Sequence, residues 1–177
     1  MQYTSSYRSP LGEILLAADE EGLTGLWFHG QKYFACGLDQ EHEESYFPLF
    51  LDVKRWLDIY FSGREPDFMP PIHMMGTPFQ LFVWEILQQI PYGGTTTYSE
   101  IAGQIARKKG LAHMSAQAVG GAVGHNRISI LIPCHRVVGA DGCLTGYAGG
   151  IEKKVRLLTL ERVNMASLHI PKSGAPL

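Results

Sequence analysis

A segment rich in proline and glycine divides this chain into two parts with different patterns. It begins at Ser62-Gly63 and includes Pro66, Pro70 and Pro71. Proline fixes φ and lacks a backbone donor, so helices and strands rarely continue through such a segment. We therefore expect one domain before it, one domain after it and a short C-terminal tail. The expected bounds are residues 1–75, 76–165 and 166–177.

The pattern before this segment indicates a small β-sheet packed against one helix. Two short apolar runs, Leu11–Ala18 and Leu23–Phe28, flank the polar turn Asp19–Gly22, which is typical of a β-hairpin. A further apolar set recurs at helical spacing and predicts an amphipathic helix that packs on the sheet. Its members are Leu49, Phe50, Val53, Trp56, Leu57 and Tyr60.

The pattern after the segment is helical. Thr77 is a candidate N-cap, Pro78 occupies the first helical position and Gln80 completes a capping box. A second capping box, Thr97–Glu100, begins a short helix, and Ser115–Gly124 forms a third segment. The whole chain is therefore expected to be α+β. The buried face of the first helix is predicted from Phe79, Phe82, Val83, Ile86, Leu87 and Ile90.

The two short helices are joined by the basic turn Arg107–Gly110 and resemble a helix-turn-helix unit. The second of them contains Gly120 and Gly121, which weaken a helix by about 1 kcal/mol each relative to alanine. Such a cost is understandable where another backbone comes very close. A DNA groove and a neighbouring helix are both compatible with the sequence at this point.

Formal charge is distributed unevenly between the two parts. The whole chain carries −2, but residues 1–76 hold 5 Lys and Arg against 12 Asp and Glu, a balance of −7. Residues 77–177 hold 10 against 5, a balance of +5. The whole-chain charge alone would argue against a nucleic-acid partner, whereas the basic second part could face phosphate groups.

The cysteine count and the absence of targeting patterns indicate a cytoplasmic protein. Cys36, Cys134 and Cys143 are odd in number, which argues against a disulfide framework. No apolar run approaches the roughly 20 residues needed to span a bilayer, and no signal peptide is recognisable. We therefore expect no contact with a membrane. We also expect no bound metal, because the spacing of His29, Cys36 and His42 matches no zinc site.

The stretch Ile130–Val138 carries the clearest chemical signal. An apolar, strand-like run leads to Cys134, which His135 and Arg136 follow directly. Thiolate is the nucleophile in cysteine chemistry, and a nearby basic group lowers the pKa of a thiol from its free value of about 8.5. Neighbours on a strand point to opposite faces, so composition alone is equally compatible with a buried structural cysteine.

The hexapeptide Pro133–Val138 resembles the signature of the methylated-DNA–protein-cysteine methyltransferases, also called O6-alkylguanine-DNA alkyltransferases. Further similar motifs extend over nearly the whole chain, and the first half is similar to the bacterial members. They are Ser9–Gly12, Gly22–Phe28, Gln31–Phe34, Tyr98, Ala118–Ala122, Asn126, Thr145–Gly150 and Leu157–Glu161. The resemblance implies a ribonuclease H-like first domain with a structural role. It also implies a mostly helical second domain that carries a winged helix-turn-helix and binds DNA.

The resemblance also implies a mechanism that needs no cofactor. Glu161 orients His135, which acts through a water as the base that deprotonates Cys134. The thiolate then displaces a methyl or other alkyl group from O6 of a guanine that is flipped out of duplex DNA. The sequence leaves open whether an alkyl group on O4 of thymine is removed as well. Tyr98 gives a proton or hydrogen bond to guanine N3. The product is a stable thioether, so the protein acts once, and we expect it to act as a monomer.

Further site residues follow from the same resemblance. The carbonyls of Cys134 and Val137 would accept from the guanine amino group, and the NH groups of Tyr147 and Ala148 would meet O6. Asn126 would tie the helix-turn-helix to the reactive loop. The other expected substrate or DNA contacts are Gly149 in the pocket wall, Ser115, Gln117, Gly120 and Gly121 in the second motif helix, and Arg136, which holds structure or contacts DNA.

The chain departs from the family pattern at a few positions. Gln117 stands where many members have an arginine that fills the gap left by the flipped base. Arg127 and Ser129 follow Asn126 where some relatives have prolines. The first difference concerns base flipping and not alkyl transfer.

Three other functions fit part of the sequence. A non-enzymatic protein that binds alkylated DNA would lack the reactive cysteine, which is present here as Cys134. A helix-turn-helix regulator would expose more base-reading side chains than Gln117 and His125. A cysteine hydrolase would need an oxyanion hole and would release product repeatedly.

Overall fold

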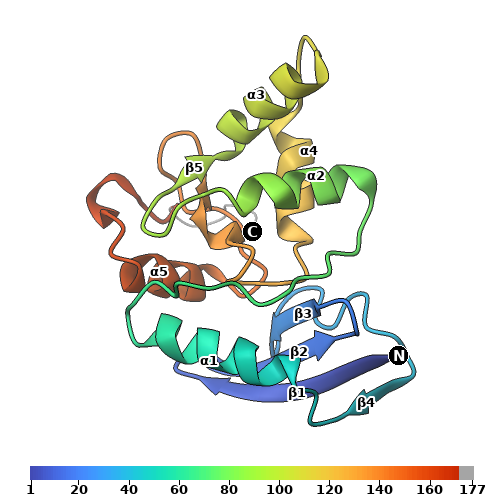
Figure 1. Ribbon diagram of the computed structural model, residues 1–177. Coiled ribbons are helices and arrows are strands. Elements are labelled where there is room, and N and C mark those ends of the chain that lie inside the picture. The colour runs from blue at the N-terminus through green and yellow to red at the C-terminus, as the bar shows by residue number, and fades with distance from the viewer. Residues whose placement is uncertain (172–177) are drawn as a thin grey trace. The chain divides into compact units, whose positions relative to one another are not determined.

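A computed structural model describes residues 1–171, which group into two compact units (Figure 1). The first unit contains Met1–Gly76 together with Arg127–Leu131, and the second contains Thr77–Asn126 and the chain from Ile132 onward. The last six residues of the expected tail lie outside the described part. The assignment of a structural role to residues 1–75 and of DNA binding to residues 76–165 stays a prediction.

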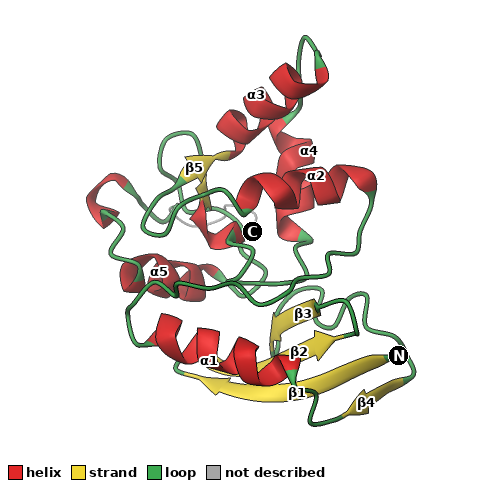
Figure 2. Ribbon diagram, viewed as in Figure 1, coloured by secondary structure: helices red, strands yellow, loops and turns green. Residues whose placement is uncertain are grey.

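The first unit is a four-stranded sheet with one helix, α1, packed on it (Figure 2). The strand order is β3-β2-β1-β4; β2 pairs antiparallel with both β1 and β3, and β4 pairs parallel with β1. The elements are β1 Gln2–Ser9, β2 Gly12–Ala18, β3 Leu23–Phe28, β4 His42–Glu44 and α1 Leu49–Phe61. The structure thus contains the predicted hairpin as β2–β3 and the predicted helix as α1; β1 and β4 were not predicted.

Burial explains why these elements hold together. The face of α1 that the spacing predicted is buried through Phe50, Val53, Trp56, Leu57 and Tyr60. Every residue of β3 is buried. A Cβ at Gly25 would lie 1.9 Å from the ring of Trp27, so only glycine lets that indole lie against the strand.

The segment Arg127–Leu131 belongs to the first unit because it lies along β3. The NH of Leu26 donates to the Arg127 carbonyl at 2.8 Å, and the NH of Ser129 donates to the Leu26 carbonyl at 3.1 Å. Ile128, Ser129 and Ile130 are all buried there. The chain therefore leaves the second unit after Asn126 and returns to it at Ile132.

The second unit is mostly helical. It contains α2 Pro78–Leu87, α3 Tyr98–Lys109, α4 Ala116–Gly124 and α5 Ile151–Leu160, the 3-10 turns Cys134–Arg136 and Met165–Ser167, and the parallel pair β5 Thr96–Thr97 and β6 Val137–Val138. Both predicted capping boxes are present, at Thr77 with Gln80 and at Thr97 with Glu100. No helix in residues 1–171 is long and apolar enough to cross a membrane.

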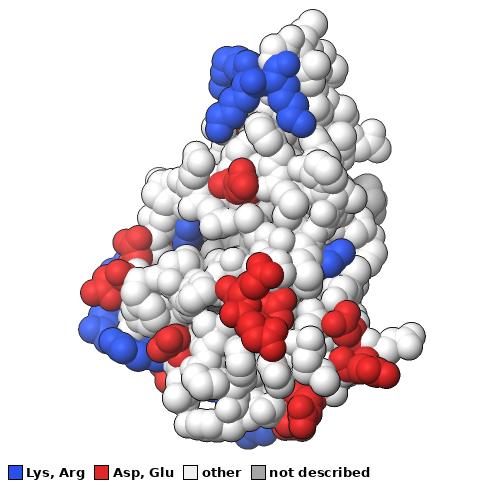
Figure 3. Space-filling model, turned by 45° about the vertical axis from the view of Figure 1, so that its right-hand side comes forward, with Lys and Arg blue, Asp and Glu red and all other residues white. Residues whose placement is uncertain are grey.

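The two expected motif helices are α3 and α4. Helix α3 ends at Gly110, whose φ of +64° terminates it in the left-handed region. Ser115 caps α4 by accepting from the NH of Ala118. The last turn of α3 carries Arg107, Lys108 and Lys109, and Figure 3 shows Lys and Arg side chains gathered at this end of the molecule. The wing of the expected motif stays a prediction.

Candidate active site

The reactive cysteine stands on a buried turn and not at the end of a strand. The expectation of a strand before Cys134 was wrong: residues 129–131 form a turn, residues 132–133 are not in a strand, and Cys134–Arg136 is a short 3-10 helix. Ile130 has a φ of +72°, a conformation that costs a β-branched residue on the order of 1–3 kcal/mol. Two features offset this strain. The preceding residues pair with β3, and the Ile130 side chain is buried. Cys134 is 6% exposed.

Asn126 connects the end of α4 to this turn. Its side-chain NH donates to the Ile132 carbonyl at 2.8 Å, and the residue is buried. Burial raises the pKa of the Cys134 thiol, and a hydrogen bond from Asn126 to the sulfur partly opposes this rise. This geometry agrees with the linking role that the resemblance implied.

A buried ionic cluster lies next to Cys134. Glu161, the C-cap of α5, faces His135 with 2.5 Å between Oε2 and Nε2. Arg136 donates to the same carboxylate at 2.7 and 3.2 Å and to the Ile90 carbonyl at 2.7 Å. The NH of Gly93 adds a further donor at 3.2 Å. Arg136 therefore acts on structure here, which is one of the two roles the sequence allowed.

The ionisation of this cluster is set by its own contacts. Burial alone would raise the pKa of Glu161, but the hydrogen bonds and positive charges of His135 and Arg136 outweigh it and lower that pKa to about 2. Burial lowers the pKa of His135, against the opposing effect of Glu161. At neutral pH the pair is therefore a neutral imidazole held by a carboxylate.

The orientation of His135 leaves a basic nitrogen available. Because Nε2 faces the carboxylate, we assign the proton to Nε2 and the lone pair to Nδ1. Within residues 1–171, Nδ1 is buried and has no hydrogen-bond partner. It can therefore accept a proton from a neighbouring thiol, directly or through a water.

Cys134 itself needs such a base. Burial raises the pKa of its thiol, and Asn126 and the charge of Lys154 only partly oppose this effect. The thiol is therefore protonated at neutral pH, and a partner must remove the proton before sulfur can act as a nucleophile.

Lys154 is a buried lysine near Cys134 that was not predicted from the sequence. Its side chain is fully buried, and Nζ donates to the carbonyls of Val137, Thr145 and Gly146 at 2.6, 2.9 and 3.2 Å. Burial lowers the pKa of Lys154 to about 8, although the charge on Cys134 opposes this shift. The burial of Lys154 could have been predicted from its helical spacing to Leu157 and Leu158, which lie on the same buried face of α5.

Tyr98 lies close to the residues that follow Cys134. The parallel pairing of Thr96–Thr97 with Val137–Val138 brings the start of α3 next to the residues that follow Cys134. The Tyr98 hydroxyl donates to the Thr145 carbonyl at 3.3 Å. Burial, and next the charge of Cys134, raise the pKa of Tyr98 to about 12, so the hydroxyl keeps its proton and can donate.

The remaining expected pocket residues lie on the loop before α5. Tyr147 is buried, whereas Ala148 and Gly149 are partly exposed. A Cβ at Gly149 would lie 2.9 Å from the Tyr147 ring, so glycine lets the loop close on that ring. Lys154 holds this loop to Val137 through the carbonyls named above.

Helix α4 presents small residues to solvent. Ser115, Gln117 and Gly121 are exposed. A Cβ at Gly121 would meet nothing within 4 Å in the described chain, and one at Gly120 would make ordinary contact with Tyr98 at 3.8 Å. Close packing of a neighbouring helix therefore does not explain why both positions are glycine. Of the two explanations that the sequence allowed, close approach of a DNA groove is the one left.

Comparison with known proteins decides the family. The model of the "6-O-methylguanine DNA methyltransferase, ribonuclease-like domain" matches residues 2–74, and that of the "6-O-methylguanine DNA methyltransferase, DNA binding domain" matches residues 78–163. The chain belongs to this family. The resemblance drawn from the hexapeptide around Cys134 is thus confirmed.

This chain is similar to individual methyltransferases over most of their length. That of Haemophilus influenzae is 40% identical over 162 residues, covering 91% of this chain and 87% of the relative. That of Bacillus subtilis, described as constitutive, is 36% identical over 168 residues, covering 93% and 98%. The crystal structure of Mycobacterium tuberculosis OGT in complex with DNA has a TM-score of 0.77 at 40% identity, covering 90% and 92%. The expected α+β fold class is confirmed.

Proposed function

We propose that this methyltransferase-family chain repairs DNA by moving a methyl or other alkyl group from O6 of guanine in duplex DNA to Cys134. It is a methylated-DNA–protein-cysteine S-methyltransferase that acts once, because the product thioether has no leaving group that water can displace. The observation that carries the proposal is the buried set of Cys134, His135 and Glu161, in which Nδ1 of a neutral imidazole is available as a base.

The transfer proceeds in two steps. The proton of the Cys134 thiol passes through a water to Nδ1 of His135, and Glu161 stabilises the imidazolium that forms. The thiolate then attacks the alkyl carbon, a carbon–sulfur bond forms, and the carbon–O6 bond breaks. The electron pair of that bond stays on the guanine.

The negative charge on the leaving guanine needs stabilisation. The Tyr98 hydroxyl retains its proton and can donate to N3. The NH groups of Tyr147 and Ala148 can meet O6, and the carbonyls of Cys134 and Val137 can accept from the amino group. Lys154 supports this pocket by fixing Val137 to the loop at Thr145.

We place DNA on the second domain, residues 76–165, and assign residues 1–75 a structural role. The basic last turn of α3 and the exposed small residues of α4 support this assignment. Ser115, Gln117, Gly120 and Gly121 would lie along the DNA. Phosphate contacts would give an affinity that falls steeply with salt and depends weakly on base sequence.

A non-enzymatic DNA-binding role is not favoured, because Cys134 and its base are both present. We further propose that the chain acts as a monomer in the cytoplasm.

Intact-protein mass spectrometry after incubation with a duplex containing O6-methylguanine tests the proposal. One methyl group should be gained by the wild-type chain and by the control Cys36→Ala, whose side chain is exposed. Cys134→Ala should gain none and still bind DNA. Repeated turnover, or a methyl group mapped to Cys36 or Cys143, would contradict the mechanism.

A further inference from the structure

The start of the C-terminal tail folds back onto the loop that precedes the pocket. The NH of Leu144 donates to the His169 carbonyl at 2.8 Å, and the NH of His169 donates to the Gly142 carbonyl at 3.0 Å. These two bonds form a short parallel bridge between Cys143 and His169. The sequence alone indicates no role for Cys143 or for this part of the chain.

Two contacts fix the tail in this position. Gly142 has a φ of +83°, and a Cβ there would lie 2.1 Å from the carbonyl oxygen of Ser167, so the tail can approach only a glycine. Leu168 packs against a buried cluster of Val138, Leu144 and Leu158. His169 is therefore held beside the Asp141–Cys143 turn by both backbone and apolar contacts.

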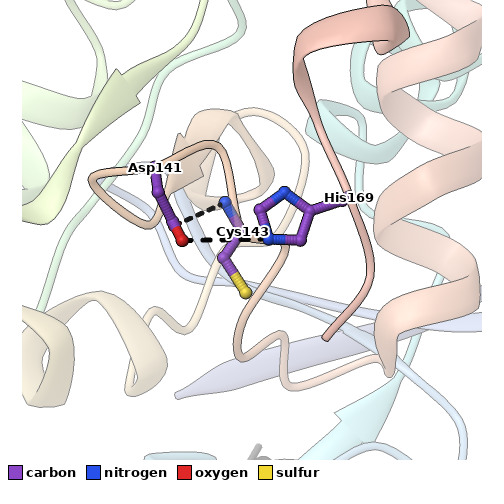
Figure 4. A group of neighbouring side chains, drawn as sticks. All are labelled: Asp141, Cys143 and His169. Atoms are coloured by element: carbon purple, nitrogen blue, oxygen red, sulfur yellow. Dashed lines mark hydrogen bonds and ion pairs between the residues drawn. The ribbon is translucent and has the colours of Figure 1, made fainter. Parts of the chain in front are cut away.

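Three different ligand groups meet at this turn, as Figure 4 shows. Oδ1 of Asp141 accepts from the NH of Cys143 at 3.1 Å, which orients the carboxylate. Its Oδ2 lies 3.8 Å from Nε2 of His169. The carboxylate, the Cys143 sulfur and the imidazole nitrogen all lie within 4.8 Å of one another.

We propose that Asp141, Cys143 and His169 bind a zinc-type divalent cation that fastens the tail to this loop. Thiolate, imidazole and carboxylate are the three ligand types that zinc accepts, whereas magnesium and calcium prefer oxygen alone. The Cys143 thiol releases its proton to solvent when it becomes a ligand.

The observed spacing is close to what the ion requires. Bond lengths of about 2.0–2.3 Å in tetrahedral geometry place ligand atoms about 3.3–3.8 Å apart. The separation of 3.8 Å between Asp141 Oδ2 and His169 Nε2 is a few tenths of an ångström longer than the roughly 3.3–3.5 Å expected for an oxygen and a nitrogen bound to one zinc ion. These side chains are 74% and 53% exposed, so rotation about their own bonds can bring them to the sulfur without moving the backbone. Three protein ligands leave the fourth position to water.

An ion pair alone does not account for the arrangement. Asp141 and His169 are exposed, and an exposed pair of this kind contributes about 0–1 kcal/mol. The backbone bridge and the contact at Gly142 nevertheless hold both groups within 4.8 Å of the Cys143 sulfur. The site lies partly beyond the matched family region, which ends at residue 163.

The proposal has a consequence for the neighbouring loop. Cys143 is followed by Leu144 and then by Thr145, whose carbonyl accepts from both Tyr98 and Lys154. A bound ion would add a crosslink between residues 141–143 and residue 169. It would therefore restrain the loop from its N-terminal side while Lys154 restrains it from α5.

Titration of the reduced full-length chain with Co²⁺, a spectroscopic substitute for Zn²⁺, tests the site directly. The wild type should bind one equivalent and develop sulfur-to-cobalt charge-transfer absorption, and Zn²⁺ should displace it. Cys143→Ser and His169→Gln should lose this absorption and weaken binding at least tenfold. The matched controls Cys36→Ser and Cys134→Ser should retain both, because their sulfur atoms lie outside the cluster.

Amide hydrogen exchange supplies a second, position-specific measurement. Zn²⁺ should slow exchange at the NH groups of Leu144 and His169 in the wild type and leave them unchanged in Cys143→Ser. Absence of binding at protein concentrations of order 100 μM, or a cobalt–sulfur signal that survives Cys143→Ser, would overturn the proposal. Neither measurement depends on alkyl transfer, so the result stands apart from that of the proposed function.

Discussion

Replacing Glu161 with glutamine perturbs the centre of the buried cluster without changing its shape. The carboxylate receives donors from His135, Arg136 and Gly93. A glutamine offers one acceptor oxygen, and its amide hydrogens point at groups that also donate. Arg136 would lose its ion pair and keep the Ile90 carbonyl, with at most a neutral hydrogen bond to the glutamine oxygen. Removing one member of a buried ion pair costs about 3–5 kcal/mol, so the variant should lose a comparable part of its free energy of unfolding at pH 7.

The pH dependence of stability gives an independent magnitude. The pKa of Glu161 is lowered from its ordinary 4.5 to about 2 in the folded chain. A lowered carboxyl pKa stabilises the fold fully above about 4.5, and this stability is lost as pH falls towards 2. The shift corresponds to about 3 kcal/mol. The Glu161→Gln chain should lack this contribution, so its stability should fall less between pH 5 and pH 2.

Denaturant unfolding at several pH values measures both effects. Glu152→Gln is the matched control, because Glu152 is exposed in the first turn of the same helix. This control should stay within about 0.5 kcal/mol of wild type. Single-turnover methyl transfer by Glu161→Gln should slow on the order of 100-fold or more, since His135 loses the group that orients it. Wild-type stability at pH 7 together with an unchanged acid slope would refute the reasoning.

Three further changes test the rest of the pocket. Tyr98→Phe should slow transfer by on the order of 10- to 1000-fold at saturating DNA while binding to undamaged DNA stays unchanged; an unchanged rate would remove Tyr98 from the mechanism. Lys154→Met removes one donor from each of three carbonyls and removes a charge that lowers the pKa of Cys134, so the pH–rate profile should move to higher pH; an unmoved profile would argue against this electrostatic role. Gln117→Arg should tighten duplex binding and speed duplex repair at low protein concentration, with little effect on a free alkylguanine base; equal effects on both substrates would place position 117 in the reactive pocket.

Local signals in the sequence predicted much of the fold. The capping boxes at Thr77 and Thr97 depend on bonds between side chains and backbone three residues apart, so sequence spacing alone reveals them. The helix over Leu49–Phe61 was equally visible, because its buried face repeats at helical spacing.

Long-range features were not predictable in the same way. The turn at Ile130 depends on pairing with Leu26, which lies about a hundred positions earlier, and an apolar run without that partner suggests a strand. Lys154 was missed because lysine is ordinarily exposed. Its burial depends on three carbonyls from β6 and a loop, and no local pattern shows that they meet.

The sequence predicted which residues form the site better than it predicted how these residues contact one another. The signature around Cys134 gave the nucleophile and its neighbours, while the contact of Arg136 with Glu161 required coordinates. The roles of Tyr98, Asn126 and the α4 residues stay predictions until the variants are measured.

The pairing of Arg127–Leu131 with β3 limits how this gene can be recombined. A breakpoint at residue 76 looks natural in the linear sequence, yet it would separate Leu26 from the Arg127 and Ser129 groups that it bonds. A chimera that joins the first half of one relative to the second half of another would combine two partners that were never selected together. The same mismatch would fall five to seven residues before the nucleophile Cys134. Exchange of whole halves should therefore give fewer active proteins than exchanges that keep the two partners from one parent.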